Sequence, residues 1–173
     1  NSALGSVAGL AVTTGNNNSL FGFGAGDAIT TGSSNIAVGA FSLSAATTAS
    51  FNTALGTSTL TNNTSGASNL AVGYGALTLN TTGGSNTAVV ADALDSNTTG
   101  ANNTAVGKSS LGANTTGANN VAIGATVLDA NTTGVYNTGI GYGALSANTT
   151  ANSNTAVGRH AMLANTTGTA NVS

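Results

Sequence analysis

Residues 103–119 read NTAVGKSSLGANTTGAN, and a closely similar segment begins 17 residues later. The repeat runs through the whole chain without an insertion, because an Asn recurs every 17 residues. These residues are Asn1, Asn18, Asn35, Asn52, Asn69, Asn86, Asn103, Asn120, Asn137, Asn154 and Asn171. The 173 residues therefore form ten complete repeats and the start of an eleventh, and we number repeat positions 1 to 17 from this Asn.

Most repeat positions hold one kind of residue. Position 3 is Ala in eight of ten repeats, position 4 is always Val, Leu, Ile or Phe, and position 5 is Gly in nine. Position 9 is Leu in seven repeats, position 13 is Thr in all ten, and position 15 is Gly in eight. Frequent Gly and Asn oppose a helix, and helical repeats need about 30 residues or more. We therefore predict an all-β fold, a parallel β-solenoid of ten 17-residue coils stacked about 4.8 Å apart.

Within each coil the pattern predicts one strand over positions 1–4, a bend at position 5, a second strand over positions 8–11 and a turn at positions 12–15. Like residues then form columns, and the position-1 Asn side chains form a hydrogen-bonded ladder. Alternation predicts that positions 4, 9 and 11 face inward, with position 2 on the same face as position 4. Position 3 would then be an outward Ala stripe against which another copy of the chain packs. A monomer with small outer side chains is the alternative.

The chain is predicted to be a single solenoid domain over residues 1–173, with atypical first repeats (1–51) and regular repeats (52–170). Position 9 is Gly in the first two repeats, and all four phenylalanines fall early, at Phe21, Phe23, Phe41 and Phe51. Terminal repeats of solenoids are commonly atypical. These phenylalanines are either a plug at the end of the core or assembly contacts for a further subunit.

The composition excludes several classes of function. Charged residues make up 3% of the chain and the net charge is −2, whereas nucleic-acid binding needs a basic surface. No apolar run approaches the roughly 18 residues of a membrane span. The few charges occur at positions 6, 7 and 10, which we expect to face solvent because like charges in one column would repel.

Residues that carry chemistry are scarce. His160 is the only histidine, and no pair of carboxylates recurs at matched spacing, so acid–base catalysis is not expected. The run GFGAGD (22–27) occurs once and lacks the surroundings of a phosphate or calcium loop. We expect no catalytic residues, no metal site and no cofactor.

The N-x-[ST] acceptor for N-glycosylation recurs at position 12. It occurs at Asn63, Asn80, Asn97, Asn114, Asn131, Asn148 and Asn165. Acceptors only about 4.8 Å apart cannot all carry a glycan. A second ladder of Asn side chains at a turn is the alternative interpretation.

The segments NNVAIG (119–124), SNIAVG (34–39), SNTAVG (153–158) and NNTAVG (102–107) resemble the head repeats of YadA-like trimeric autotransporter adhesins. They are also similar to NTAVG-rich repeats of phage tail-fibre-like and bacterial surface proteins. This resemblance covers essentially the whole chain. It implies a left-handed parallel β-roll, often trimeric, in an extracellular stalk or adhesive head.

We therefore expect a structural, self-associating module of an extracellular filament or cell-surface adhesin fibre, with no catalytic activity. The expected partner is another copy of the chain, with a host or biofilm surface as a further candidate and no nucleic acid. The alternative function is an ice-binding β-solenoid, because regular Thr rows can order water. Against this alternative, the Thr residues at positions 13 and 14 are adjacent and are expected to face opposite sides.

Overall fold

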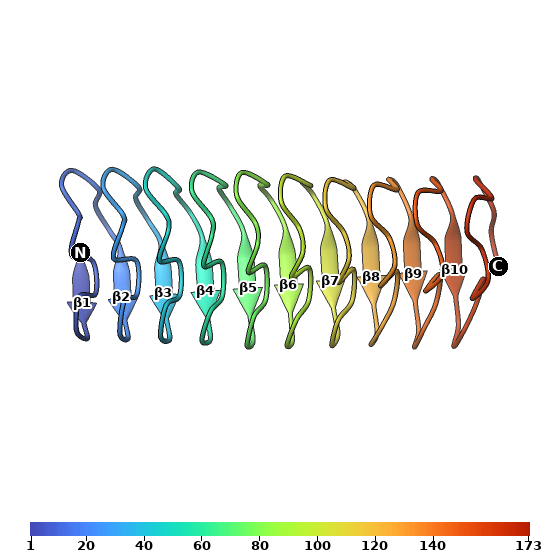
Figure 1. The fold of residues 1–173 in the computed structure, drawn as a ribbon, viewed down its shortest axis with the longest axis horizontal. Helices are drawn as coiled ribbons and strands as arrows, with labels where there is room; N and C mark the ends of the chain where they lie inside the picture. Colours follow the sequence, from blue (N-terminus) through green and yellow to red (C-terminus); the bar gives the residue numbers. More distant parts are fainter.

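The computed structural model describes all 173 residues, and its regular secondary structure consists of ten short parallel strands. The strands are β1 (Ser2–Leu4), β2 (Ser19–Phe21), β3 (Ile36–Val38), β4 (Thr53–Leu55), β5 (Leu70–Val72), β6 (Thr87–Val89), β7 (Thr104–Val106), β8 (Val121–Ile123), β9 (Thr138–Ile140) and β10 (Thr155–Val157). They form one sheet in chain order, and each repeat makes one coil of a straight rod (Figure 1). The predicted parallel β-solenoid is confirmed.

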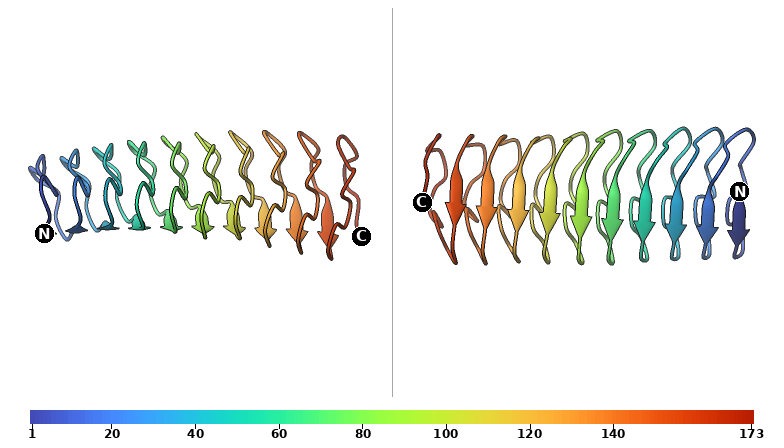
Figure 2. Two further views of the ribbon diagram at one scale, coloured as in Figure 1. Left: turned by 60° about the horizontal axis from the view of Figure 1, so that its bottom comes forward. Right: turned by 180° about the vertical axis from the view of Figure 1, so that it is seen from behind.

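Neighbouring strands pair in a single register, in which every residue lies beside the residue 17 positions away. Thr87 pairs with Thr104, for example, and Ala88 pairs with Ala105. The register continues past β10 through a bridge between Thr155 and Val172. Seen from below and from behind, the strands remain in one row along the whole rod (Figure 2). The structure contains no helix with the length and apolar character needed to cross a membrane.

The prediction of a second strand over positions 8–11 is wrong, because this segment forms turns. In the fourth coil, the Asn63 N–H donates to the Leu60 carbonyl at 3.2 Å, which closes a turn over positions 9–12. Leu60 itself has φ 50°, and a positive φ is incompatible with an extended strand. The turns still stack, since the Leu60 N–H donates to the Ala76 carbonyl of the next coil at 3.1 Å.

The core lies between position 3 on the sheet and positions 8 and 9 on the turns. Ala88, at position 3, is fully buried in contact with a continuous core that includes Leu94 at position 9. The inward prediction for position 9 is therefore confirmed. The predictions that positions 4, 2 and 11 face inward and position 3 outward are wrong: Val38 at position 4 is 40% exposed and Leu79 at position 11 is 46% exposed.

The interior is narrow, and this narrowness explains why Ala occupies position 3. The second coil carries Leu20 there and Gly26 at position 9; a Cβ on Gly26 would lie 2.8 Å from Leu20 Cδ2. The ninth coil carries Gly139 at position 3, where a Cβ would lie 2.5 Å from Cγ1 of Val127. Large side chains in the core are therefore matched by glycine on the opposite wall, as close packing requires.

Two buried columns of Asn side chains run along the rod. At position 1, Asn35 donates from both its backbone N–H and its Nδ2 to Asn18 Oδ1, each at 3.0 Å. At position 12, Asn80 Nδ2 donates to Asn63 Oδ1 at 2.8 Å and to the Gly83 carbonyl at 2.9 Å. That carbonyl also accepts from Nδ2 of the position-1 residue Asn69 at 2.9 Å, so the two columns share one row of acceptors.

Glycine at a tight turn is often required by a positive φ, but this is not the reason for Gly at position 15. Gly83 and Gly100 do not have a positive φ. A Cβ at Gly83 would instead collide with the carbonyl oxygen of Gly100 in the next coil. A positive φ occurs at position 5, which is Gly in all coils except that of Val90, and at positions 7, 9 and 17. The last three positions are occupied mainly by residues other than glycine, such as Leu60, Ser109 and Asn102.

Candidate interaction surfaces

The outer face of the sheet presents positions 2 and 4 of every coil to solvent. Position 4 is aliphatic or aromatic in all ten coils, and neither position carries a charge anywhere in the chain. Ile123 on β8 and Ile140 on β9 are 41% and 37% exposed. We call this surface the outer sheet face.

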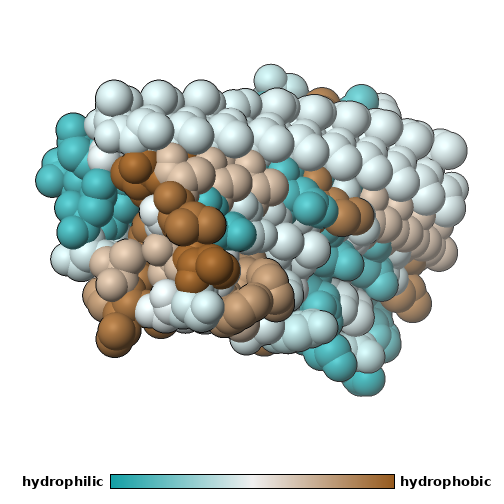
Figure 3. Space-filling view, turned by 60° about the vertical axis from the view of Figure 1, so that its left-hand side comes forward, coloured by the Kyte–Doolittle hydropathy of each residue, from teal (hydrophilic) through white to brown (hydrophobic).

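An aromatic group lies near the N-terminal end of the rod. Phe23 and Phe41 pack edge to face with ring centroids 5.1 Å apart, in an arrangement favoured by the charge distribution of aromatic rings. Phe21 belongs to the outer sheet face, and Phe51 is 66% exposed at position 17. The four phenylalanines are thus exposed, yet they do not form a single surface. Figure 3 shows apolar atoms gathered on the lower part of this end.

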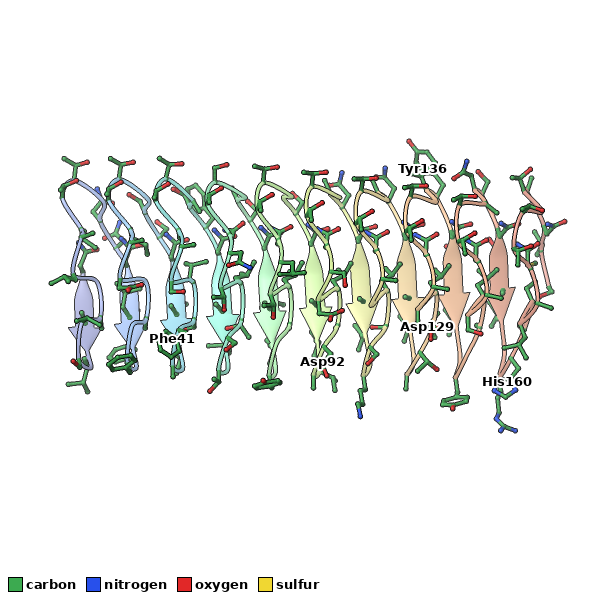
Figure 4. The ribbon with its side chains drawn as sticks, viewed as in Figure 1. Phe41, Asp92, Asp129, Tyr136 and His160 are labelled. Atoms are coloured by element: carbon green, nitrogen blue, oxygen red, sulfur yellow. The ribbon has the colours of Figure 1, made fainter.

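A second aromatic group lies near the opposite end. The rings of Tyr142 and His160 have centroids 5.3 Å apart, and Arg159 Cζ lies 5.8 Å from the centre of the Tyr142 ring. Gly143 makes room for this contact, because a Cβ there would lie 2.7 Å from His160 Cδ2. His160 and Phe41 both lie on the lower edge of the rod, while Tyr136 lies on the upper edge (Figure 4). His160 and Arg159 are exposed, as their positions predicted.

The acidic residues are partly buried on the wall of the rod. Burial raises the pKa of Asp95 above its ordinary value, and the nearby charge of Asp92 raises it further. Burial also raises the pKa of Asp129. One carboxyl oxygen of Asp129 and one of Asp27 are buried without a hydrogen-bond partner. The surroundings of Asp95 and Asp129 therefore favour the neutral form of these two carboxyl groups.

The upper edge of the rod carries the Thr residues of positions 13 and 14. The position-13 hydroxyls are bound internally along most of the rod; Thr98 Oγ1, for example, donates to the Thr115 carbonyl at 3.0 Å. Position 14 is exposed in every coil, including Thr99 and Thr116. The position-13 Thr residues are either half-buried or exposed in every coil. Neither Thr column therefore belongs to the buried core.

The position-12 Asn side chains lie inside the rod rather than along an open edge. Asn63, Asn80, Asn97, Asn114, Asn131 and Asn148 are 0% exposed, and Asn165 in the last full coil is half-buried. In Asn97, Nδ2 donates to Asn80 Oδ1 at 2.7 Å and to the Gly100 carbonyl at 3.0 Å. Both amide hydrogens are used inside the rod, so the ladder interpretation describes this column.

The structure contains no pocket and no group of three or more His, Cys, Asp or Glu side chains placed to hold a metal ion. The surfaces available for interaction are therefore the open faces and edges described above. Comparison with protein-family models, curated proteins and solved structures finds no match to this chain.

Proposed function

We propose that this chain is a structural, self-associating module of an extracellular filament or surface fibre, without a catalytic role, and that copies associate laterally through their outer sheet faces. The observation that carries the proposal is the uncharged apolar column at position 4. Ten strands spaced about 4.8 Å apart and a face about 10 Å wide give roughly 480 Å². This is the area of the whole face, in which the apolar column of position 4 lies beside Ser or Thr at position 2 in seven of ten coils. Apolar patches of a few hundred Å² on monomers are often functional.

The geometry of the face favours a second copy as its partner. Both faces would have the same strand spacing, so the side chains of one copy could interdigitate with those of the other, as in stacked sheets. The near absence of charge removes the repulsion that would otherwise oppose contact between identical surfaces. Resemblance to YadA-like heads and to tail-fibre-like repeats supports an extracellular location. The Ala stripe at position 3 is buried, so it has no part in this assembly.

The test uses two lysine variants of the fourth coil. Leu55 is 36% exposed on the outer sheet face, and Thr57, two residues later, is exposed outside the strand. We expect the wild-type chain to form multimers by light scattering and fibres by electron microscopy. Leu55→Lys should shift the mass toward the monomer, and Thr57→Lys should not. A monomeric wild-type chain, or equal effects of the two substitutions, would contradict the proposal.

Ice binding is a second candidate, favoured by the exposed position-14 Thr column. No position-14 hydroxyl, such as that of Thr116, forms a hydrogen bond within the rod, so a row of free hydroxyls repeats with the strand spacing of about 4.8 Å. Thermal hysteresis of the purified chain tests this function. It should be reduced by Thr116→Lys and unaffected by Leu55→Lys, whereas a chain without thermal hysteresis excludes ice binding.

A further inference from the structure

Within the ten complete repeats, three further N-x-[ST] sequences occur outside position 12, and each has an exposed Asn. They are Asn17-Asn18-Ser19, Asn62-Asn63-Thr64 and Asn102-Asn103-Thr104. We propose that Asn17, Asn62 and Asn102, rather than the position-12 residues, are the acceptors for N-linked glycans in the folded chain. The glycan donor is a lipid-pyrophosphate-linked oligosaccharide used by an oligosaccharyltransferase.

The chemistry requires a free side-chain amide. In the transfer, Asn Nδ2 forms a bond to the anomeric carbon of the oligosaccharide, the bond from that carbon to the pyrophosphate oxygen breaks, and lipid pyrophosphate leaves. Nδ2 loses one proton and keeps one hydrogen. An acceptor Asn in a folded protein must therefore have an amide hydrogen to spare and space for a bulky, solvated sugar.

The position-12 residues lack this space, because six of the seven are fully buried, and all of them except Asn63 also use both amide hydrogens within the rod. Asn114 Nδ2 donates one hydrogen to Asn97 Oδ1 at 2.8 Å and the other to the Gly117 carbonyl at 3.0 Å. A glycan there would remove one buried hydrogen bond and place a sugar where the side chain is 0% exposed. Asn171, in a further sequon at the start of the eleventh coil, is exposed and differs in that its Nδ2 belongs to the position-1 ladder, donating one hydrogen to Asn154 Oδ1 at 3.1 Å.

The three exposed residues meet both conditions. Asn62 lies at position 11 and Asn102 at position 17, and neither Nδ2 is engaged within the rod. Asn17, also at position 17, donates only to its neighbour Asn16, at 3.3 Å across an exposed pair. The three lie in the first, fourth and sixth coils, so successive acceptors are separated along the rod by about 14 Å and about 10 Å. That spacing avoids the crowding of a continuous column. None of the three is at position 2 or 4, so glycans would leave the outer sheet face open.

The test is to direct the full chain through the secretory pathway of a glycosylating eukaryotic cell. Glycans are removed from the secreted protein by an amidase in heavy-oxygen water, which converts each occupied Asn to labelled Asp, and the labels are located by peptide fragmentation. We expect labels at Asn17, Asn62 and Asn102 and none at position 12. Labels at buried position-12 residues in folded, secreted protein, or their absence from both Asn62 and Asn102, overturn the proposal.

The fourth coil supplies a matched pair of control variants. Thr64→Ala removes the acceptor sequence of Asn62 but leaves that of Asn63, whereas Ser65→Ala does the reverse. Thr64→Ala should remove one glycan from the secreted protein, and Ser65→Ala should remove none. If the chain is retained in the cell, its protease-resistant folded fraction and its aggregated fraction are mapped separately. Position-12 glycans confined to the aggregates support the proposal, and position-12 glycans in the protease-resistant folded fraction overturn it.

Discussion

Asn62 and Asn63 are adjacent in the chain, yet Asn63 is fully buried in a hydrogen-bonded column while Asn62 is exposed. Asn63 Nδ2 donates to the Gly66 carbonyl at 2.9 Å, and its Oδ1 accepts from Asn80 Nδ2 at 2.8 Å. The repeat position, rather than the residue type, thus decides what a side chain does in this rod.

The position-1 ladder should not tolerate a carboxylate. In Asn103, Nδ2 donates to Asn86 Oδ1 at 3.2 Å and to the Gly117 carbonyl at 2.8 Å. Asn103→Asp removes both donors and places a buried charge against two acceptors, so the free energy of unfolding should fall by about 3 kcal/mol or more at neutral pH. Denaturant titration measures this change. Asn102→Asp, at the exposed neighbouring residue, should alter stability by no more than about 0.5 kcal/mol.

A side chain at position 139 should compete with the Val127 side chain for the same space in the core. A Cβ at Gly139 would lie 2.5 Å from Val127 Cγ1, so Gly139→Ala alone should destabilise the rod by about 1–3 kcal/mol. Val127→Ala removes the obstructing methyl groups, and the double variant should recover most of that loss. A double-mutant cycle with thermal or denaturant unfolding measures the coupling, which should be at least about 1 kcal/mol. Additive effects would show that the two walls do not pack against each other.

Replacing the one residue other than glycine at position 5 by glycine should relieve backbone strain. Val90 is the one residue other than glycine at this position, with φ 88°, and a β-branched residue in that region is strained. Val90→Gly should therefore raise the free energy of unfolding by about 1 kcal/mol. The matched change is Gly107→Ala, whose Cβ would collide with the Gly124 carbonyl oxygen, and it should lower the melting temperature. Lower stability of Val90→Gly would contradict the strain interpretation.

Stability should increase on acidification. Burial raises the pKa of Asp95 and of Asp129 above 3.8, the ordinary value of each carboxyl group. The folded state therefore binds protons more tightly than the unfolded state. The stabilisation is fully present below pH 3.8 and is lost as the pH rises through the raised folded-state values.

The predicted rise in stability on acidification is checked by the melting temperature, measured from neutral pH down to about pH 3. Carboxyl groups are the main groups that titrate in that range. The variant Asp95→Asn combined with Asp129→Asn should melt at a temperature that depends less on pH. Acid unfolding of the wild-type chain would count against the assigned direction of the two shifts.

Much of the fold could be predicted from the repeat. A period of 17 without insertions predicted the parallel stacking, and the recurring Asn at position 1 predicted its ladder. The turns that replace the predicted second strand could not be predicted in the same way. Leu60 and its equivalents at position 9 adopt a positive φ that sequence rules reserve mainly for Gly and Asn. Their conformation is determined by hydrogen bonds to the neighbouring coil, which a single repeat does not contain.

The candidate surfaces could be predicted from the sequence only in part. Lys108, Arg159 and His160 are exposed as predicted from their positions, whereas the four Asp residues of positions 7 and 10, also expected to face solvent, are partly buried. The Ala stripe was assigned to the outside and the aliphatic residues of position 4 to the core, and the structure reverses both. One signal in the sequence could have found this reversal: Leu20 replaces Ala at position 3 where Gly26 replaces Leu at position 9, as two facing walls of one core require.

The sequence by itself determined that like residues lie above one another along one axis, because a constant repeat length permits only one register between neighbouring coils. The tertiary structure alone decided which columns are inside. Alternation along a strand allows either face to be buried, and the choice depends on how much space remains between the sheet and the turns. That space accommodates Ala against Leu, so the larger residues of position 4 remain on the surface, where another molecule can reach them.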